Sequence, residues 1–159
     1  MIYDRKKAVE YAQIWALGRN PNYYNFNGIG GDCTNFVSQC IFAGSSGIMN
    51  YTKDTGWFYN SSKKRAAAWS GVEYLHKFLT TNTKAGPHGT EMPLEYAEPG
   101  DIIQLSYDGN TFGHSLFIVS TKPEIIVAQH SSENYVDRPF STYQYQRARL
   151  IHIDGVRIG

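Results

Sequence analysis

A cysteine follows a glycine-rich stretch and starts an amphipathic run in the segment GIGGDCTNFVSQC, residues 28–40. Phe36, Val37 and Cys40 come three, four and seven positions after Cys33, which is the spacing of one helix face. Cys33 is therefore expected in the first turn of a helix, where the helix dipole and unpaired backbone N–H groups favour a thiolate. A thiolate there can attack a carbonyl group, and the remaining N–H groups can hold the resulting oxyanion.

A structural role for the thiol is the alternative interpretation, because a lone cysteine on an apolar helix face is usually a packing residue. Cys40, which lies among apolar neighbours, fits that role well. Cys33 fits it less well, since Asp32 precedes it and Thr34 and Asn35 follow it. The helix N-terminus alone leaves both roles open, and a nucleophilic role requires a base.

Two of the five histidines stand where they can serve as that base. His114 begins the apolar run HSLFIVS, and His130 ends the run IIVAQH after a turn. A hairpin centred on Lys122 places His114 directly opposite His130, with Cβ atoms roughly 4.5–5.5 Å apart, so that one imidazole can orient the other. A shift of one residue would instead place Gln129 opposite His114, and a glutamine can also orient a base. We favour His130, while an ordinary polar role for both histidines at a sheet edge stays open.

The first two helices are predicted from their caps and apolar spacing. Asp4 is the candidate N-cap of the first, whose apolar positions recur at helical spacing up to about Gly18. The second runs from about Asp32 to Ala43, with Asp32 as its N-cap and Gly44 as its stop. A loop of turn-forming residues and tyrosines leads into this second helix, which places the thiol at the junction of loop and helix.

The rest of the chain is predicted to contain a third helix and then an antiparallel sheet. SGVEYLHKFL, residues 70–79, has Ser70 and Glu73 in capping-box spacing. Residues 86–100 are rich in proline and glycine, and after them the apolar period changes from helical to alternating. Four short β-branched runs follow: DIIQLSY, HSLFIVS, EIIVAQH and RARLIHID. Helices followed by strands indicate one α+β domain, residues 1–159, with a meandering antiparallel sheet packed on the cysteine-bearing helix.

Composition excludes several classes of protein. The chain has 159 residues, of which 42% are hydrophobic and 18% charged, as in an ordinary soluble globular domain. Its net charge of +1, without a basic stripe, argues against a nucleic-acid partner. No apolar run reaches the roughly 18–20 residues of a membrane span, and no targeting signal is evident. We expect a monomer without a transmembrane segment.

Neither a disulfide nor a metal is expected. Cys33 and Cys40 on one helix would be about 10 Å apart along its axis, beyond the roughly 7 Å limit for a disulfide. A zinc site is disfavoured because His114 and His130 lack a third ligand besides Cys33, and no zinc-binding motif occurs. We therefore expect no cofactor.

The 12 tyrosines exceed the needs of a small core and favour a groove for a polar polymer such as a peptide or glycan.

The segment WALGRNPNYYNFNGIGGDCTNFVSQCIFAG, residues 15–44, resembles the signature of the Putative amidase domain family of Gram-positive bacteria. That family is similar to the NlpC/P60 and CHAP groups of papain-like cysteine hydrolases. PNYYNFNGIGGDCTNF parallels the NlpC/P60 pattern of a tyrosine, a glycine-rich loop and Asp-Cys-Ser-Gly. EPGDIIQL and GHSLFIV parallel its Pro-Gly-Asp strand and its catalytic-histidine strand, so the resemblance covers nearly the whole chain.

This resemblance implies a papain-like fold and a role for individual residues. Cys33 would be the nucleophile, His114 the general base and then acid, and His130 the third member. The residues expected to shape the oxyanion or substrate-amine pocket are Asp32, Thr34 and one of Tyr23 or Tyr24. Two departures from the family pattern concern that pocket. Asn35 stands where a glycine often follows Cys-Ser. The glutamine that often precedes the cysteine in the oxyanion hole of papain-like peptidases is absent, so Asn27 or a tyrosine must substitute for it.

The residues and the resemblance together predict a thiol-dependent amide hydrolase whose substrates are peptides, with peptidoglycan stem peptides implied by the family. The resemblance also implies an extracellular or cell-envelope location. Two other functions stay open. One is a non-catalytic module in which the tyrosine loop binds a cell-wall peptide or glycan and Cys33 is structural. The other is an acyltransferase that uses the same cysteine and histidine.

Overall fold

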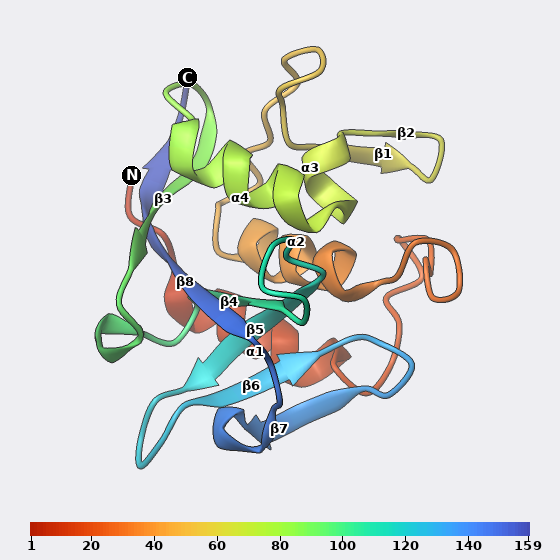
Figure 1. Ribbon diagram of the computed structural model, residues 1–159. Coiled ribbons are helices and arrows are strands. Elements are labelled where there is room, and N and C mark those ends of the chain that lie inside the picture. Colours follow the sequence, from red (N-terminus) through yellow and green to blue (C-terminus); the bar gives the residue numbers. More distant parts are fainter.

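The computed structural model describes residues 1–159 and shows an α+β architecture with a six-stranded antiparallel sheet (Figure 1). The helices are α1 (Arg5–Trp15), α2 (Cys33–Ala43), α3 (Ala67–Ser70) and α4 (Val72–Thr81). The sheet strands, in spatial order, are β3 (Gly86–Met92), β8 (Arg147–Arg157), β4 (Ile102–Ser106), β5 (His114–Ser120), β6 (Ile126–Gln129) and β7 (Tyr135–Pro139). A separate hairpin contains β1 (Tyr59–Ser61) and β2 (Lys64–Arg65), and two 3-10 turns span Leu94–Tyr96 and Phe140–Thr142.

Alternation along the strands divides the apolar side chains between the two faces of the sheet. Ile102 and Phe117 belong to the larger core cluster, which they share with all four helices. Their chain neighbours Ile103 and Ile118 belong to a smaller cluster on the opposite face. The expected packing of the sheet on α2 is confirmed, and α2 itself is buried over most of its length.

Both predicted N-terminal helices are present. The Asp4 carboxylate accepts a hydrogen bond from the Lys7 backbone N–H at 3.1 Å, which confirms Asp4 as the cap of α1. Asp32 occupies the N-cap position of α2, but its side chain makes no capping hydrogen bond. The prediction that Asp32 caps the helix is therefore wrong for its carboxylate, which is buried and bonded to other partners.

The predicted capping box of the third helix is also wrong. Ser70 is the last residue of α3, and the extended backbone of Gly71 separates α3 from α4. Glu73 lies in the first turn of α4, where its carboxylate pairs with Arg149 of β8. Glu73, which the local pattern assigned to a helix cap, therefore forms an ion pair with a residue distant in the sequence.

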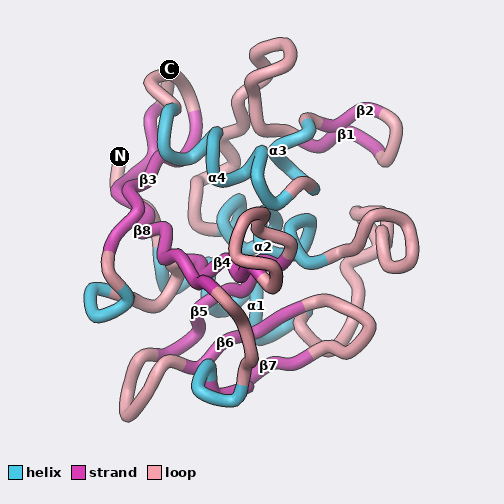
Figure 2. Tube along the Cα trace, in the orientation of Figure 1, coloured by secondary structure: helices cyan, strands magenta, loops and turns pink.

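The C-terminal sheet contains the four predicted strands and two more. β3 lies inside the proline- and glycine-rich stretch, for which no strand was predicted, and β7 was not predicted either. Strands β4 to β6 form the expected meander, and β7 extends it. The predicted last strand, β8, does not follow β6 in space but lies between β3 and β4. The last strand is thus interior to the sheet, as Figure 2 shows, with long loops before and after α2.

The β5–β6 hairpin has a different register from the predicted one. A hairpin centred on Lys122 would pair Phe117 with Val127, whereas the structure pairs Phe117 with Ala128. The register shifts within β5 just before Ser120. Because side chains alternate between faces, this difference of one residue exchanges the faces of the residues that end β6.

No helix has the length and apolar character required to cross a bilayer.

Candidate active site

Cys33 is the first residue of α2 and is partly exposed. The backbone N–H groups of this first turn have no acceptor within the helix. The Cys33 Sγ lies 3.7 Å from the hydroxyl of Thr34, which is buried and bonded to the Ser115 hydroxyl of β5 at 2.9 Å. Thr34 thus joins the helix N-terminus to the strand that begins with His114.

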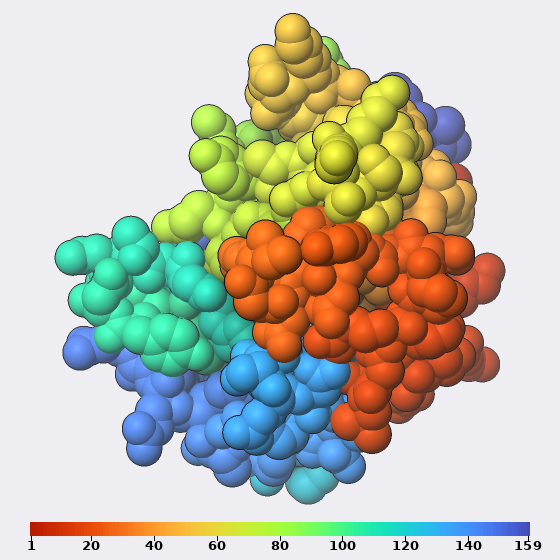
Figure 3. Space-filling model, turned by 90° about the vertical axis from the view of Figure 1, so that its right-hand side faces the viewer, coloured from red at the N-terminus to blue at the C-terminus, as the bar shows by residue number.

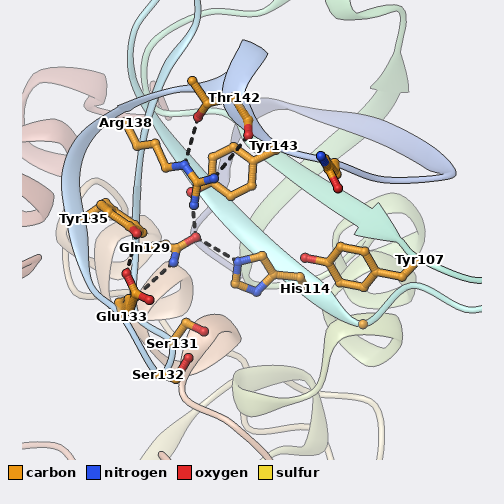
Figure 4. Close-up of a pocket in the computed structure, with 12 residues that line it drawn as sticks. Tyr107, His114, Gln129, Ser131, Ser132, Glu133, Tyr135, Arg138, Thr142 and Tyr143 are labelled. Atoms are coloured by element: carbon orange, nitrogen blue, oxygen red, sulfur yellow. Dashed lines mark hydrogen bonds between the residues drawn. The ribbon is translucent and has the colours of Figure 1, made fainter.

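His114 is held by Gln129 and not by His130. The His114 Nε2 lies 3.0 Å from the side-chain oxygen of Gln129, as Figure 4 shows. The Gln129 amide nitrogen donates to the backbone carbonyl of Glu133 at 2.8 Å, which fixes the orientation of the amide. Since the amide oxygen accepts, Nε2 carries the hydrogen and Nδ1 is the nitrogen left for the thiol of Cys33.

The charges of Cys33 and His114 stabilise each other. Burial raises the pKa of Cys33, but hydrogen bonding and charge interaction with His114 outweigh it, so the thiol pKa lies below its ordinary value. Burial lowers the pKa of His114, but the bonds to Cys33 and Gln129 bring it above its ordinary value. Cys40, by contrast, is fully buried, and burial raises its pKa well above the usual range. These directions favour a thiolate–imidazolium pair at Cys33 and His114.

His130 lies on the other face of the hairpin, so the prediction that it opposes His114 is wrong. Its Nδ1 lies 2.8 Å from an oxygen of Asp32, and its Nε2 lies 2.9 Å from the backbone carbonyl of Trp15. Its ring is buried and stacks on Phe36 with centroids 4.1 Å apart. Both ring nitrogens are thus engaged by oxygen atoms of Asp32 and Trp15, and neither is directed at the thiol of Cys33.

Asp32 holds the start of α2 in place instead of contacting the thiol. Its carboxylate accepts from the backbone N–H of Phe26 and the side chain of Asn35, each at 2.9 Å, in addition to His130. Arg19 approaches it at 3.5 Å. Burial raises the pKa of Asp32, but the hydrogen bonds, that from His130 first, bring it below the ordinary value. Asp32 is therefore a buried carboxylate stabilised from several elements.

The remaining predicted pocket residues lie farther from this chemistry. Tyr24 is exposed, and its backbone accepts from Asn35 and donates to Tyr59. Asn27 is exposed, and its side chain makes no hydrogen bond to Cys33 or His114. Asn35 also accepts from the Trp69 indole, which explains why an asparagine replaces glycine there: it ties the loop, α2 and α3 together.

A cavity of about 630 Å³ lies beside His114 and Gln129. It is lined mostly by polar residues from the ends of β5 and β6 and from β7 and the turn after it. Figure 3 shows the face of the molecule where the segments near residues 25, 110 and 132 meet. The sequence patterns missed this cavity, because β7 was not predicted. No group of three or more His, Cys, Asp and Glu side chains is arranged to hold a metal ion.

Comparison with known protein families assigns most of the chain to one of them. The model of the family described as "Putative amidase domain" matches residues 2–153. The chain belongs to this family. Cys33, His114 and Gln129 thus all lie within the matched region of a Putative amidase domain. At the coarse level, family membership indicates an amide hydrolase.

A relative of this amidase-family chain occurs in Bacillus subtilis (strain 168), where it is named Uncharacterized protein YhbB. The two are 34% identical over 121 residues, which is 74% of this chain and 37% of the relative. The chain thus spans little more than a third of the length of that protein. No solved structure matches the chain.

Proposed function

We propose that this chain is a thiol-dependent amide hydrolase in which Cys33 is the nucleophile, His114 the general base and acid, and Gln129 the residue that orients His114. The observation that carries the proposal is the placement of the Cys33 thiol at the start of α2 beside His114, whose Nε2 is held by Gln129. The pKa values of Cys33 and His114 shift in the directions expected for an ion pair. His130, first expected as the third member, is assigned to the positioning of Asp32 and α2.

The proposed reaction has two steps. The Cys33 thiolate attacks the amide carbonyl carbon and forms a C–S bond, while backbone N–H groups at the start of α2 stabilise the oxyanion. The His114 imidazolium then donates a proton to the amine as the C–N bond breaks. In the second step, His114 takes a proton from water, the hydroxide attacks the thioester, and the carboxylic acid leaves as Cys33 is regenerated.

We further propose that residues 1–159 act as one papain-like domain and that the substrates are peptides of the peptidoglycan stem type. The support is the resemblance of the Cys33 and His114 segments to those cysteine hydrolases, together with the helix-borne thiol and strand-borne histidine of the present fold. A cavity lined by polar groups next to His114 suits a peptide better than an apolar ligand.

The test is the rate of iodoacetamide alkylation of the folded protein against pH, resolved by peptide mass. Cys33 is expected to react rapidly at pH values well below the ordinary thiol pKa of about 8.5. Buried Cys40 is expected to be inert. Incubation of the protein with isolated peptidoglycan peptides, followed by mass spectrometry, then identifies the bond cut.

The proposal would be overturned if Cys33 were as inert as Cys40. Ligand binding that persists in C33A, without hydrolysis, would indicate a binding module. A product carrying an added amine in place of water would indicate an acyltransferase.

A further inference from the structure

The cavity beside His114 contains an arginine that the proposed mechanism does not use. Arg138 extends from β7 into the cavity wall, where Tyr107, Gln129 and Tyr143 also lie (Figure 4). We refer to this space as the Arg138 cavity. Its lining is predominantly polar, so a bound group would be recognised by charge and hydrogen bonds more than by apolar contact.

The guanidinium of Arg138 is held in one position by its neighbours. Its Nε donates to the Thr142 hydroxyl at 2.9 Å, and Nη2 donates to the Thr142 carbonyl at 3.2 Å. Its central carbon lies 3.8 Å from the centre of the Tyr143 ring and 4.8 Å from that of Tyr135. An arginine fixed in this way loses little conformational entropy when it binds a ligand.

Arg138 has no anionic partner within the protein. Arg5 and Arg149 pair with carboxylates, whereas no carboxylate oxygen lies within 4.0 Å of the Arg138 nitrogens. Glu133, on the same cavity wall, accepts a hydrogen bond from the Tyr135 hydroxyl instead. The Nη1 group makes no hydrogen bond, so it is available to a ligand together with the full positive charge.

The position of the cavity determines which part of a substrate would enter it. Cys33 does not line the cavity, whereas His114 and Gly113 do. His114 gives its proton to the leaving amine, so the amine side of the scissile amide must lie next to His114. Tyr107 lines the same cavity as His114 and Arg138. The cavity that holds Arg138 therefore lies on the leaving-group side of Cys33, next to His114.

We infer that Arg138 selects amide substrates whose amine-side portion carries a carboxylate, as in an acylated amino acid or a peptide with a free carboxylate beyond the scissile bond. This inference rests on the proposed hydrolase function and names the substrate class of the same site. A carboxylate can accept from the Nη1 side of the guanidinium, because Thr142 occupies Nε and one hydrogen of Nη2, and the aromatic rings pack against the planar group.

The experiment measures how well peptides protect Cys33 from iodoacetamide. Three peptide mixtures are compared, and in each the second residue, Xaa, varies. The first is acetyl-Ala-Xaa with a free C-terminal carboxylate, the second is the same set of peptides as C-terminal carboxamides, and the third is succinyl-Ala-Xaa carboxamides. The first set carries the charge on the amine side, and the third carries it on the acyl side. The free carboxylates are expected to protect Cys33 at about tenfold lower concentration than the carboxamides, as one charge-assisted pair would produce.

Variants assign that difference to the residue. R138Q is expected to remove the preference for the carboxylate, and R138K to keep part of it. T142V retains the charge but removes the hydrogen bond to Nε, so a reduced preference is expected. R147Q is the matched control, because Arg147 is an exposed arginine that does not line the cavity, and its loss changes the net charge equally. Each protection curve is compared with alkylation of the same variant without peptide, and an unreactive Cys40 in that sample reports that the variant is folded.

The outcomes separate the two proposals. If Cys33 is alkylated no faster than Cys40, the hydrolase proposal is overturned, and so is the inference that rests on it. If Cys33 is reactive but the free carboxylates protect no better than the carboxamides, or no peptide protects at its highest soluble concentration, this inference alone is overturned. A preference that persists in R138Q, or one shown only by the succinyl peptides, overturns it as well.

Discussion

His114 begins strand β5 and His130 directly follows strand β6 of the same hairpin, yet the two histidines lie in opposite chemical environments. One nitrogen of His114 is held by Gln129, the other is left for the thiol, and a cavity opens beside the ring. Both nitrogens of His130 face oxygen acceptors, and its ring is buried against Phe36. A histidine therefore becomes a candidate base through a nitrogen that the protein leaves unoccupied, whereas a fully bonded histidine stabilises the fold.

The largest expected effect concerns the base itself. H114A removes the proton acceptor and donor, so amide hydrolysis should fall by about a thousandfold or more, and C33A should be inactive. The rate of product formation by mass spectrometry measures both, with C40A as the control that should keep its activity if it folds. A fully active H114A protein would contradict the mechanism.

The buried histidine should matter for stability instead. H130A leaves the Asp32 carboxylate without its closest partner, so we expect a loss on the order of 3 kcal/mol in the free energy of unfolding. Urea denaturation measures this loss, and H88A is a suitable control because His88 makes no side-chain hydrogen bond and is only partly buried. The folded fraction of H130A should still alkylate at Cys33. A stable H130A protein with an unreactive thiol would reverse the roles of the two histidines.

Loss of the orienting glutamine should have an intermediate effect on the base. Q129A removes the bond to His114 Nε2 but leaves the imidazole present, so kcat should fall about tenfold to a hundredfold. Q129E, which still accepts at that position, should raise the pH at which the imidazolium loses its proton. An unchanged pH profile in both variants would mean that Gln129 does not orient the base.

The smallest expected effect is the acid dependence of stability that Asp32 contributes. Its pKa in the folded protein lies below the ordinary value of 3.8. The stabilisation is therefore fully present above that value and is lost as the pH falls through the lower, folded-state pKa. Unfolding free energies of the wild type and D32N between neutral and acidic pH should converge at the acidic end. A gap that stays constant with pH would show that Asp32 acts without its charge.

Much of the site was predictable from local pattern. Helical spacing placed Cys33 in the first turn of α2, and the apolar run after His114 placed that histidine at the start of a strand. Turn-rich sequence next to the cysteine indicated the loop that reaches it. These features depend on residues within a few positions of each other, and so the chain carries them without reference to its fold.

The partner of His114 depended on strand pairing, which local pattern does not specify. A register difference of one residue in the β5–β6 hairpin turned Gln129 toward His114 and His130 toward Asp32. Either register satisfies the alternating pattern near the turn, and only packing of both faces selects one.

By itself, then, the sequence determined the family, the α+β class, and the positions of the thiol and one histidine at the ends of their elements. The tertiary structure alone decided that Asp32 stabilises the helix start from within the core, that Gln129 orients His114, and that β7 brings an unpaired Arg138 beside the site. Helix spacing and turns arise from neighbours in the chain, whereas the face of a strand residue and the partner of a buried charge arise from segments distant in sequence.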